Sequence, residues 1–404
     1  MNKITKVVLY LTIFLIPFYF FRFKVLGLPT NALEVMVGIL ALLTAVDLFW
    51  SRRPWRFGSS LPYLFVLAAF AAVYLSSDHT RALGQAKGWF LMPVLLYWSL
   101  LNNIGKKELK YLSIPVFISL ILISVWAILQ KAGVVTTLFY QTDDSSFYQY
   151  LVGNFRVFGP FESPNYLAMF LVPMGFLSLP VFDLVKSKIS KILLGVSYIL
   201  PLMALLYSGS RAGVIALVAS LVIYLFLTKA ENIGSKILRY SLAVAAFLAG
   251  GLFLYQYGFN PASDSIRLEI YRYAGQLLRD NWLCGIGLGD FQDRIALITQ
   301  NAESFKTFAL PYAIHPHNVY LAVWLNLGLA GIIVFAGLVV EFFRKLFHGG
   351  RNSLVFAGAF MAMLAILAHG MFDTTYFKND LSMIFFLTVA IAAINKKVKL
   401  TKTD

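Results

Sequence analysis

Two histidines mark the point where a long polar segment gives way to apolar sequence, in the stretch I-H-P-H-N-V-Y-L-A-V-W-L-N-L-G-L-A-G of residues 314–331. Pro316 suits the first turn of a helix, because the N–H that proline lacks has no partner there. His317 is therefore expected at or near the N-terminus of an apolar helix. The positive end of the helix dipole favours a neutral imidazole, which can accept a proton. The pattern predicts a general base or a ligand contact at His317, with a structural hydrogen-bonding role as the alternative.

His315 and His317 are also possible metal ligands. A metal site needs a third ligand, and the neighbouring sequence offers neither an H-E-x-x-H motif nor a carboxylate-rich cluster. Residues two positions apart do not share one face of a helix. We therefore expect no metal and no cofactor, and we assign His315 to substrate contact.

Several arginines stand at unusual positions. Arg211 lies in S-G-S-R-A-G at the start of an apolar run, where the usual role is a membrane anchor. Its small neighbours allow a ligand close to the backbone, which favours an anion and phosphate above all. Arg267 and Arg272 lie in a polar, tyrosine-rich stretch, and Tyr271 shares a helix face with Arg267. Simple solvation is the alternative for both loop arginines, and the sequence leaves open which of them is functional.

A second group of polar residues ends another polar segment, N-F-R-V-F-G-P-F-E-S-P-N-Y-L-A of residues 154–168. Arg156 adds a cation there, and Pro164 and Asn165 precede the next apolar run. His369, Asp373 and Tyr376 close the same end of a later apolar segment. The glycine-rich turn G-I-G-L-G-D, residues 285–290, follows no strand, so ordinary turn chemistry is expected there and not a phosphate loop.

Composition places these residues in a membrane protein. The chain has 404 residues, of which 59% are hydrophobic and 13% charged, and its mean hydropathy is +0.74. Its net charge of +15 lies mostly in short loops and without basic tracts interleaved with aromatics, so nucleic acid is not an expected partner. The single cysteine, Cys284, excludes an intramolecular disulfide and a cysteine-based metal cluster.

About twelve apolar segments are long enough to cross a bilayer as helices. They are residues 7–22, 32–50, 61–76, 88–102, 111–130, 163–182, 191–207, 211–228, 238–256, 316–341, 353–369 and 381–395. The fold class is therefore an all-α, polytopic integral membrane protein. We expect one transmembrane domain over residues 1–404, with a large outer loop between the ninth and tenth segments. This loop, residues 257–315, is expected to contain short helices that contribute to the active site.

The distribution of basic residues predicts the orientation of the chain. More than half of the 34 Lys and Arg residues fall in alternate short loops and at the two ends. By the positive-inside rule both termini are cytoplasmic. Arg211, Arg267 and His317 then all lie on the outer side, the periplasm in a bacterium. Arginines and a candidate base on one face suit chemistry on a diphosphate whose lipid tail lies in the bilayer.

These motifs resemble those of bacterial O-antigen ligases and of the superfamily that also contains O-antigen polymerases and related oligosaccharyltransferases. The resemblance rests on the stretch from Arg156 to Ala168, on S-G-S-R-A-G, on the segment from Arg267 through L-C-G-I-G-L-G-D-F, and on H-P-H-N-V-Y-L-A. It implies a GT-C-like membrane fold. It also implies transfer of a glycan from undecaprenyl diphosphate to the lipid A–core oligosaccharide in lipopolysaccharide biosynthesis, inverting and without a metal. The implied partners are that donor, that acceptor and membrane lipids, and the implied location is the inner membrane with a periplasmic active site.

The resemblance also implies residue roles. His317 matches the essential histidine of the family, Arg211 its arginine after small residues, and Arg267 its loop arginine, and we expect these three to be catalytic. The remaining candidates are expected to contact substrate: Arg156, Asn165, Tyr271, Arg272, His315, Asn318 and His369. A polymerase or another oligosaccharyltransferase would share these motifs. A transporter of lipids or anionic solutes is less consistent, because charge clusters at one face and not in mid-membrane.

Overall fold

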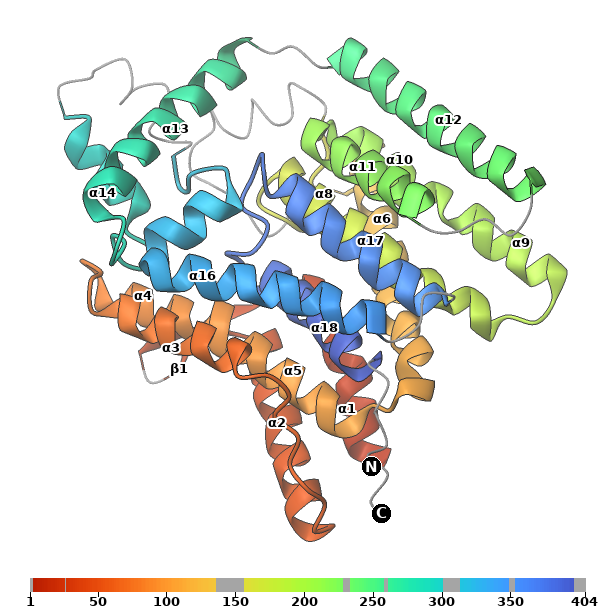
Figure 1. The fold of residues 1–404 in the computed structure, drawn as a ribbon, viewed down its shortest axis with the longest axis horizontal. Coiled ribbons are helices and arrows are strands. Elements are labelled where there is room, and N and C mark those ends of the chain that lie inside the picture. The colour runs from red at the N-terminus through yellow and green to blue at the C-terminus, as the bar shows by residue number, and fades with distance from the viewer. Residues whose placement is uncertain are drawn as a thin grey trace.

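The computed structural model describes residues 3–25, 27–135, 156–227, 233–257, 261–300, 313–348 and 353–395. Within these ranges the chain is almost entirely helical (Figure 1). The helices are α1 (Lys3–Phe14), α2 (Ala32–Trp50), α3 (Leu61–Val73), α4 (His79–Gln85), α5 (Met92–Asn103), α6 (Ser113–Lys131), α8 (Pro164–Ser178), α9 (Lys188–Ser197), α10 (Ile199–Ser208), α11 (Arg211–Leu227), α12 (Ile233–Tyr257), α13 (Pro261–Asn281), α14 (Phe291–Ile298), α16 (Val319–His348), α17 (Leu354–His369) and α18 (Asn379–Asn395).

A helix lies at each of the predicted apolar segments, which confirms a mostly helical membrane protein. Five helical stretches among the described residues are long and apolar enough to cross a bilayer: Ala32–Trp50, Lys106–Lys131, Pro164–Leu184, Lys188–Ser208 and Val319–His348. Shorter apolar helices are α3, α11, α17 and α18. Twelve crossings and a GT-C-like arrangement stay predictions.

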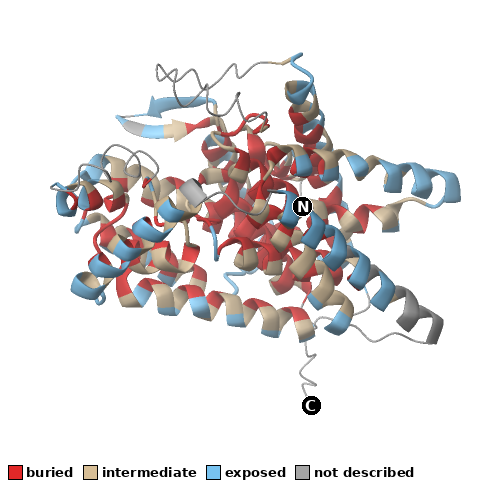
Figure 2. Ribbon diagram, turned by 90° about the horizontal axis from the view of Figure 1, so that it is seen from above, coloured by how far each residue is buried: buried red, intermediate tan, exposed pale blue. Residues whose placement is uncertain are grey.

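The core is formed where the apolar helices pack on one another. α17 packs against α8 and α11, α18 against α5, and α16 against α3. Figure 2 shows the buried residues gathered in the middle of the molecule and exposed residues along the outward faces of the peripheral helices. Many of these outward residues are large and apolar, such as Leu42, Leu67 and Leu193. In water such faces would be unfavourable, whereas lipid solvates them, which agrees with an integral membrane protein.

Two short strands interrupt the helices and were not expected from the sequence. β1 (Arg22–Val25) and β2 (Leu28–Asn31) form an antiparallel hairpin, with Arg22 opposite Asn31. Within the predicted apolar segment 7–22, the helix ends at Phe14, a 3₁₀ turn covers Ile16–Phe18, and the strand begins at Arg22. The Lys87 ammonium donates to the carbonyl of Pro29 and to the Thr30 hydroxyl, at 2.5 and 2.7 Å, and so ties the hairpin to the segment before α5.

The glycine-rich turn inserts into a break in α16. Gly328 has φ +66° and ψ −167°, which no residue within an α-helix adopts. At the break, the Ile286 N–H donates to the Leu325 carbonyl at 2.7 Å, and the Leu329 N–H donates to the Leu283 carbonyl at 3.0 Å. A Cβ at Gly285 would lie 2.5 Å from the Leu325 oxygen, so only glycine fits. The predicted turn is confirmed, and its backbone joins α13 and α14 to α16.

Candidate active site

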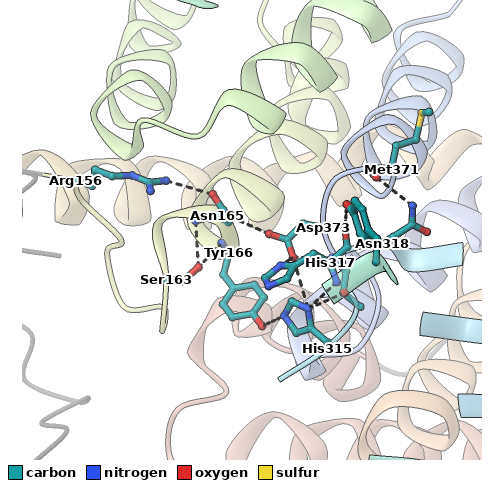
Figure 3. A network of polar contacts seen from close by, with 11 residues as sticks. Arg156, Ser163, Asn165, Tyr166, His315, His317, Asn318, Met371 and Asp373 are labelled. Atoms are coloured by element: carbon teal, nitrogen blue, oxygen red, sulfur yellow. Dashed lines mark hydrogen bonds and ion pairs between the residues drawn. The ribbon is translucent and has the colours of Figure 1, made fainter. Parts of the chain in front are cut away.

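Three connecting segments bring the polar candidates together. They are the residues before α8, the residues before α16, and the segment between α17 and α18, as Figure 3 shows. The polar side chains lie on or next to loops, and the packed helices hold these loops in place, which is a common arrangement of active sites.

The start of α8 supplies Asn165. Ser163 is the N-cap, and its hydroxyl accepts from the backbone N–H groups of Asn165 and Tyr166 at 3.2 and 3.4 Å. Pro164 occupies the first helical position, as expected for a residue without an N–H. The cap fixes the first turn, and the Asn165 amide then donates to Asp373 Oδ2 at 2.8 Å.

His317 lies just before α16 in a strained backbone conformation. The helix begins at Val319, so the prediction that Pro316 opens it was wrong. Asn318 is the residue that satisfies the first turn, because its side-chain oxygen accepts from the N–H groups of Tyr320 and Leu321, both at 3.0 Å. His317 has φ +46°, in the left-handed region that non-glycine residues rarely adopt. Such strain is typical of functional sites where the surroundings hold the residue in place.

One of the contacts that hold His317 comes from α13. The Tyr271 hydroxyl donates to the His317 carbonyl at 2.8 Å. Residues Pro261–Asn281 are thus helical, and this helix reaches the histidine, whereas its place in a large outer loop stays a prediction. In this geometry Tyr271 fixes the histidine backbone.

Asp373 is the centre of the hydrogen-bond network. Its Oδ1 lies 3.2 Å from His317 Nδ1 and accepts from the Thr374 N–H at 2.9 Å. Burial works to raise the pKa of Asp373, but the charge and hydrogen bond of His317, with His315 and Arg267, outweigh it and hold that pKa well below its usual range. Because a carboxylate only accepts, the proton of a neutral His317 is on Nδ1, and Nε2 is its basic nitrogen.

His315 lies beside this pair, with its Nδ1 3.8 Å from Asp373 Oδ1, and stays neutral. Its Nε2 lies 3.0 Å from the Tyr166 hydroxyl, and its Nδ1 lies 3.0 Å from the Thr374 hydroxyl. Burial, and then the charge of His317, lower the pKa of His315 to about 3. A neutral imidazole at this position can orient hydroxyl groups over the whole physiological pH range.

The two loop arginines differ clearly in their surroundings. Arg272 is exposed, and its guanidinium lies 5.8 Å from the ring of Tyr273. Arg267 is half-buried and close enough to the centre that its charge contributes to lowering the pKa of both Asp373 and His315. The geometry therefore favours Arg267 over Arg272 as the loop arginine that acts on a substrate at His317.

Arg211 opens α11 and pairs with α13. Its guanidinium donates to both oxygens of Asp264, at 3.0 and 2.6 Å. The Asp264 side chain is 40% exposed and that of Arg211 is 21% exposed. A phosphate matches the same fork of donors, so binding an anion here means exchanging one partner for another.

Arg156 and His369 have structural contacts. Arg156 Nε donates to the Ser208 carbonyl at 2.8 Å, and its terminal nitrogen donates to the Asn165 side-chain oxygen at 3.3 Å. It braces the S-G-S turn against the first turn of α8. His369 is buried at the end of α17, where its carbonyl accepts from the Asp373 N–H at 3.0 Å. Asn318 likewise donates to the Met371 carbonyl at 3.1 Å, next to the same segment. These residues position the site in this structure.

The structure provides the third metal ligand that the neighbouring sequence lacked. His315, His317 and Asp373 each offer a ligand atom, and these atoms lie within 4.8 Å of one another. The carboxylate is distant in sequence, because Asp373 belongs to the segment between α17 and α18. All three groups already take part in the hydrogen bonds described above. Absence of a metal stays a prediction.

In the sequence Asp373 stands out only as a residue at the end of an apolar segment, and Thr374 and Tyr166 were not predicted to belong to the site. Nothing in the spacing along the chain connects residue 373 with residue 317. The available signal was weak: Asp373 is the one carboxylate in the segment between two apolar helices, residues 370–378, and a charge in such a place is often functional.

A comparison with known protein families matches the part of the chain that carries three of the predicted site residues. Residues 196–336 match the family model described as O-antigen ligase, a segment that contains Arg211, Arg267 and His317. The match supports a member of the O-antigen ligase and polymerase family, which confirms the resemblance. The family indicates glycosyltransferase activity of the O-antigen ligase or polymerase type, on lipid-linked glycans in general. No curated protein matches the chain.

Proposed function

We propose that the protein transfers a glycan from undecaprenyl diphosphate to a hydroxyl of the lipid A–core oligosaccharide. The observation that carries the proposal is the His317–Asp373 pair, with Nδ1 and Oδ1 3.2 Å apart. Asp373 is itself held by Asn165 and Thr374. A base that is oriented by a fixed carboxylate is the arrangement that activates a hydroxyl nucleophile.

The step balances with these groups alone. The acceptor hydroxyl gives its proton to Nε2 of His317 as its oxygen bonds to the anomeric carbon of the donor sugar. The bond from that carbon to the diphosphate oxygen breaks, and undecaprenyl diphosphate leaves with the electron pair. A single displacement of this kind inverts the anomeric centre. His317 becomes an imidazolium, which the Asp373 carboxylate stabilises.

Negative charge develops on the leaving diphosphate. Arg267 supplies a positive charge close to Asp373 and His315. Arg211 supplies a second guanidinium, which exchanges Asp264 for phosphate. Fixed cations at a leaving group stabilise the transition state as a divalent metal does elsewhere. The proposed reaction therefore uses no metal.

The proposed location is the inner membrane. The charge bias of the loops supports cytoplasmic termini, and it supports a periplasmic face for the residues around His317. In that orientation the loop of residues 257–315 lies over the active site as part of a single transmembrane domain. The lipid tail of the donor would then lie along the exposed apolar helices.

The first experiment uses purified protein, an undecaprenyl-diphosphate glycan and a chelator, with and without lipid A–core. A single shift of the lipid A–core band on a gel is expected. A ladder that forms on the polyprenyl carrier without lipid A–core would instead identify a polymerase. Loss of activity on chelation, restored by a divalent metal, would overturn the metal-independent mechanism and direct attention to His315, His317 and Asp373 as ligands.

A further inference from the structure

A cavity of about 690 Å³ lies beside His315 and is not explained by the proposed catalytic residues. Of the described residues, its lining includes Tyr166, His315 and Thr374 but neither His317 nor Arg267. Its volume falls in the usual range of ligand sites. The cavity therefore lies on the His315 side of the group formed by His315, His317 and Asp373. Neither Arg211 of α11 nor Arg267 of α13 is among its lining residues.

The lining combines aromatic, amide and charged side chains. Its aromatic members include Tyr19, Trp89 and Phe377, and its amides include Gln85 and Asn379. Its charged members are Arg22, Lys24, Glu34, Arg81, Glu162 and Lys378. Aromatic rings offer flat apolar faces, and amides both donate and accept hydrogen bonds. A sugar has the matching properties, with apolar ring faces and hydroxyls that both donate and accept.

The hydrogen bonds of His315 decide where the Tyr166 proton points. The His317 backbone N–H donates to His315 Nδ1 at 3.4 Å, so Nδ1 is an acceptor and also accepts from the Thr374 hydroxyl at 3.0 Å. The proton of the neutral ring is therefore on Nε2, which donates to the Tyr166 oxygen at 3.0 Å. The Tyr166 hydroxyl is left with its own proton to donate, and Tyr166 is one of the residues that line the cavity.

Lys378 packs against the face of the Tyr166 ring. Its ammonium lies 3.7 Å from the ring centroid, a close cation–π contact. The same ammonium is paired with Glu162 at 2.6 Å and bonded to the Tyr19 hydroxyl at 2.9 Å. Burial works to raise the pKa of Glu162, but Lys378 and Arg22 outweigh it and lower that pKa to about 2. A cation against the ring withdraws electron density and makes the phenol a stronger donor.

We propose that this cavity binds the glycan of the acceptor, and that Tyr166 donates a hydrogen bond to one of its sugar oxygens. The proposal rests on the proposed transferase function and names the place where its second substrate binds. In this arrangement the acceptor enters beside His315, while the diphosphate lies toward Arg267. The acceptor hydroxyl then extends past His315 to Nε2 of His317, where it meets the donor sugar. The Glu162–Lys378 ion pair acts indirectly, as the support of the Tyr166 ring.

The test measures binding without transfer. Two probes are titrated separately into the purified full-length protein: the delipidated lipid A–core oligosaccharide and undecaprenyl diphosphate. The donor's own glycan, released from its carrier, serves as a second oligosaccharide. Tyr166→Phe removes only the hydroxyl and is expected to weaken oligosaccharide binding about 3- to 10-fold. Undecaprenyl diphosphate should bind the variant as it binds the wild type.

The matched control is Tyr198→Phe. The Tyr198 hydroxyl also makes a half-buried hydrogen bond, to the Ser178 hydroxyl at 2.7 Å, but Tyr198 does not line the cavity. This variant should bind both probes normally. Trp89→Leu removes an aromatic face of the cavity and provides an independent second variant, expected to weaken the oligosaccharide alone.

Each outcome decides the proposal. Unchanged oligosaccharide affinity in folded Tyr166→Phe and Trp89→Leu proteins would overturn it, as would failure of the wild type to bind either oligosaccharide at millimolar concentration. An equal loss of both probes would assign Tyr166 to support of the whole site and also overturn it. The proposed function fails differently, through absence of transfer by a wild-type protein that still binds the oligosaccharide.

Discussion

Two regions of the site, the histidine centre and the Arg211–Asp264 ion pair, differ in how their side chains are held in place. The histidine centre consists of His315, His317, Asp373 and Thr374, and its members satisfy one another through several hydrogen bonds at 2.9–3.4 Å. Arg211 instead pairs with the carboxylate of Asp264, which is 40% exposed.

This difference matches the roles proposed for the two regions, a general base and a diphosphate clamp. A base must be oriented before the substrate arrives, because reorientation during the reaction costs rate. A clamp for a diphosphate must release its resting partner, and an exposed carboxylate is easily displaced since water solvates it afterwards. We therefore expect substitutions in the histidine centre to lower kcat, and substitutions in the Arg211–Asp264 ion pair to change the affinity for the donor.

The largest expected effect belongs to His317→Gln. Glutamine preserves a polar side chain but cannot take the proton, so kcat should fall by about 10²- to 10⁴-fold. Affinity for undecaprenyl diphosphate should stay within twofold, as measured by titration. His348→Gln is the control, because His348 lies at the far end of α16. A kcat near that of the wild type would refute the base assignment.

Asp373→Asn should follow, with a loss in kcat of about 10²-fold or more. The amide keeps the shape of the carboxylate but can donate to His317, which favours the tautomer with its proton on Nε2. Steady-state kinetics with both substrates would measure the loss. If donor KM rose while kcat stayed constant, Asp373 would belong with the binding groups, and the comparison of the two regions would fail.

The sequence predicted the helical architecture because runs of apolar residues determine which segments a bilayer can hold. It also predicted His317, Arg211 and Arg267 through the motifs around them. It could not predict the partners Asp373 and Asp264. Asp373 meets His317 only through the packing of α8, α16 and α17, and Asp264 meets Arg211 only where α13 approaches α11. The β1–β2 hairpin was missed for a similar reason, since its short strands depend on Lys87 and Glu162 elsewhere in the chain.

Several polar residues near the site have contacts within the chain that the sequence could not predict. Asn318, which is expected to contact substrate, caps α16 through its side-chain oxygen and donates to the Met371 carbonyl. Arg156, which is likewise expected to contact substrate, supports the S-G-S turn and Asn165. Substrate contact by either residue stays a prediction. A polar side chain near a catalytic residue is as often a support as a contact, and sequence gives no distance to tell them apart.

Arg211→Lys tests the exchange of partners. Lysine keeps the charge but loses the fork of donors, so the KM for the donor should rise about tenfold with little change in kcat. Asp264→Asn is the matched change on the other side, and it should leave donor KM equal or lower it, because the competing charge is gone. If both variants instead lost thermal stability and kept donor KM, the pair would be a link between α11 and α13 and not a clamp.

The smallest effect concerns pH and thermal stability. In the folded protein the pKa of His315 is about 3, whereas the ordinary value is 6.5. Between these values the unfolded chain binds a proton that the folded protein does not, so stability is present above pH 6.5 and falls as the pH drops. His315→Asn removes this titration. Between pH 7.5 and 5.5 the Tm of the wild type in detergent should therefore fall by about 1–3 °C more than that of the variant. Groups elsewhere titrate equally in both proteins, so the difference reports His315. Parallel pH profiles would mean that His315 accepts a proton in the folded state, and the histidine centre would then be less rigid than the comparison requires.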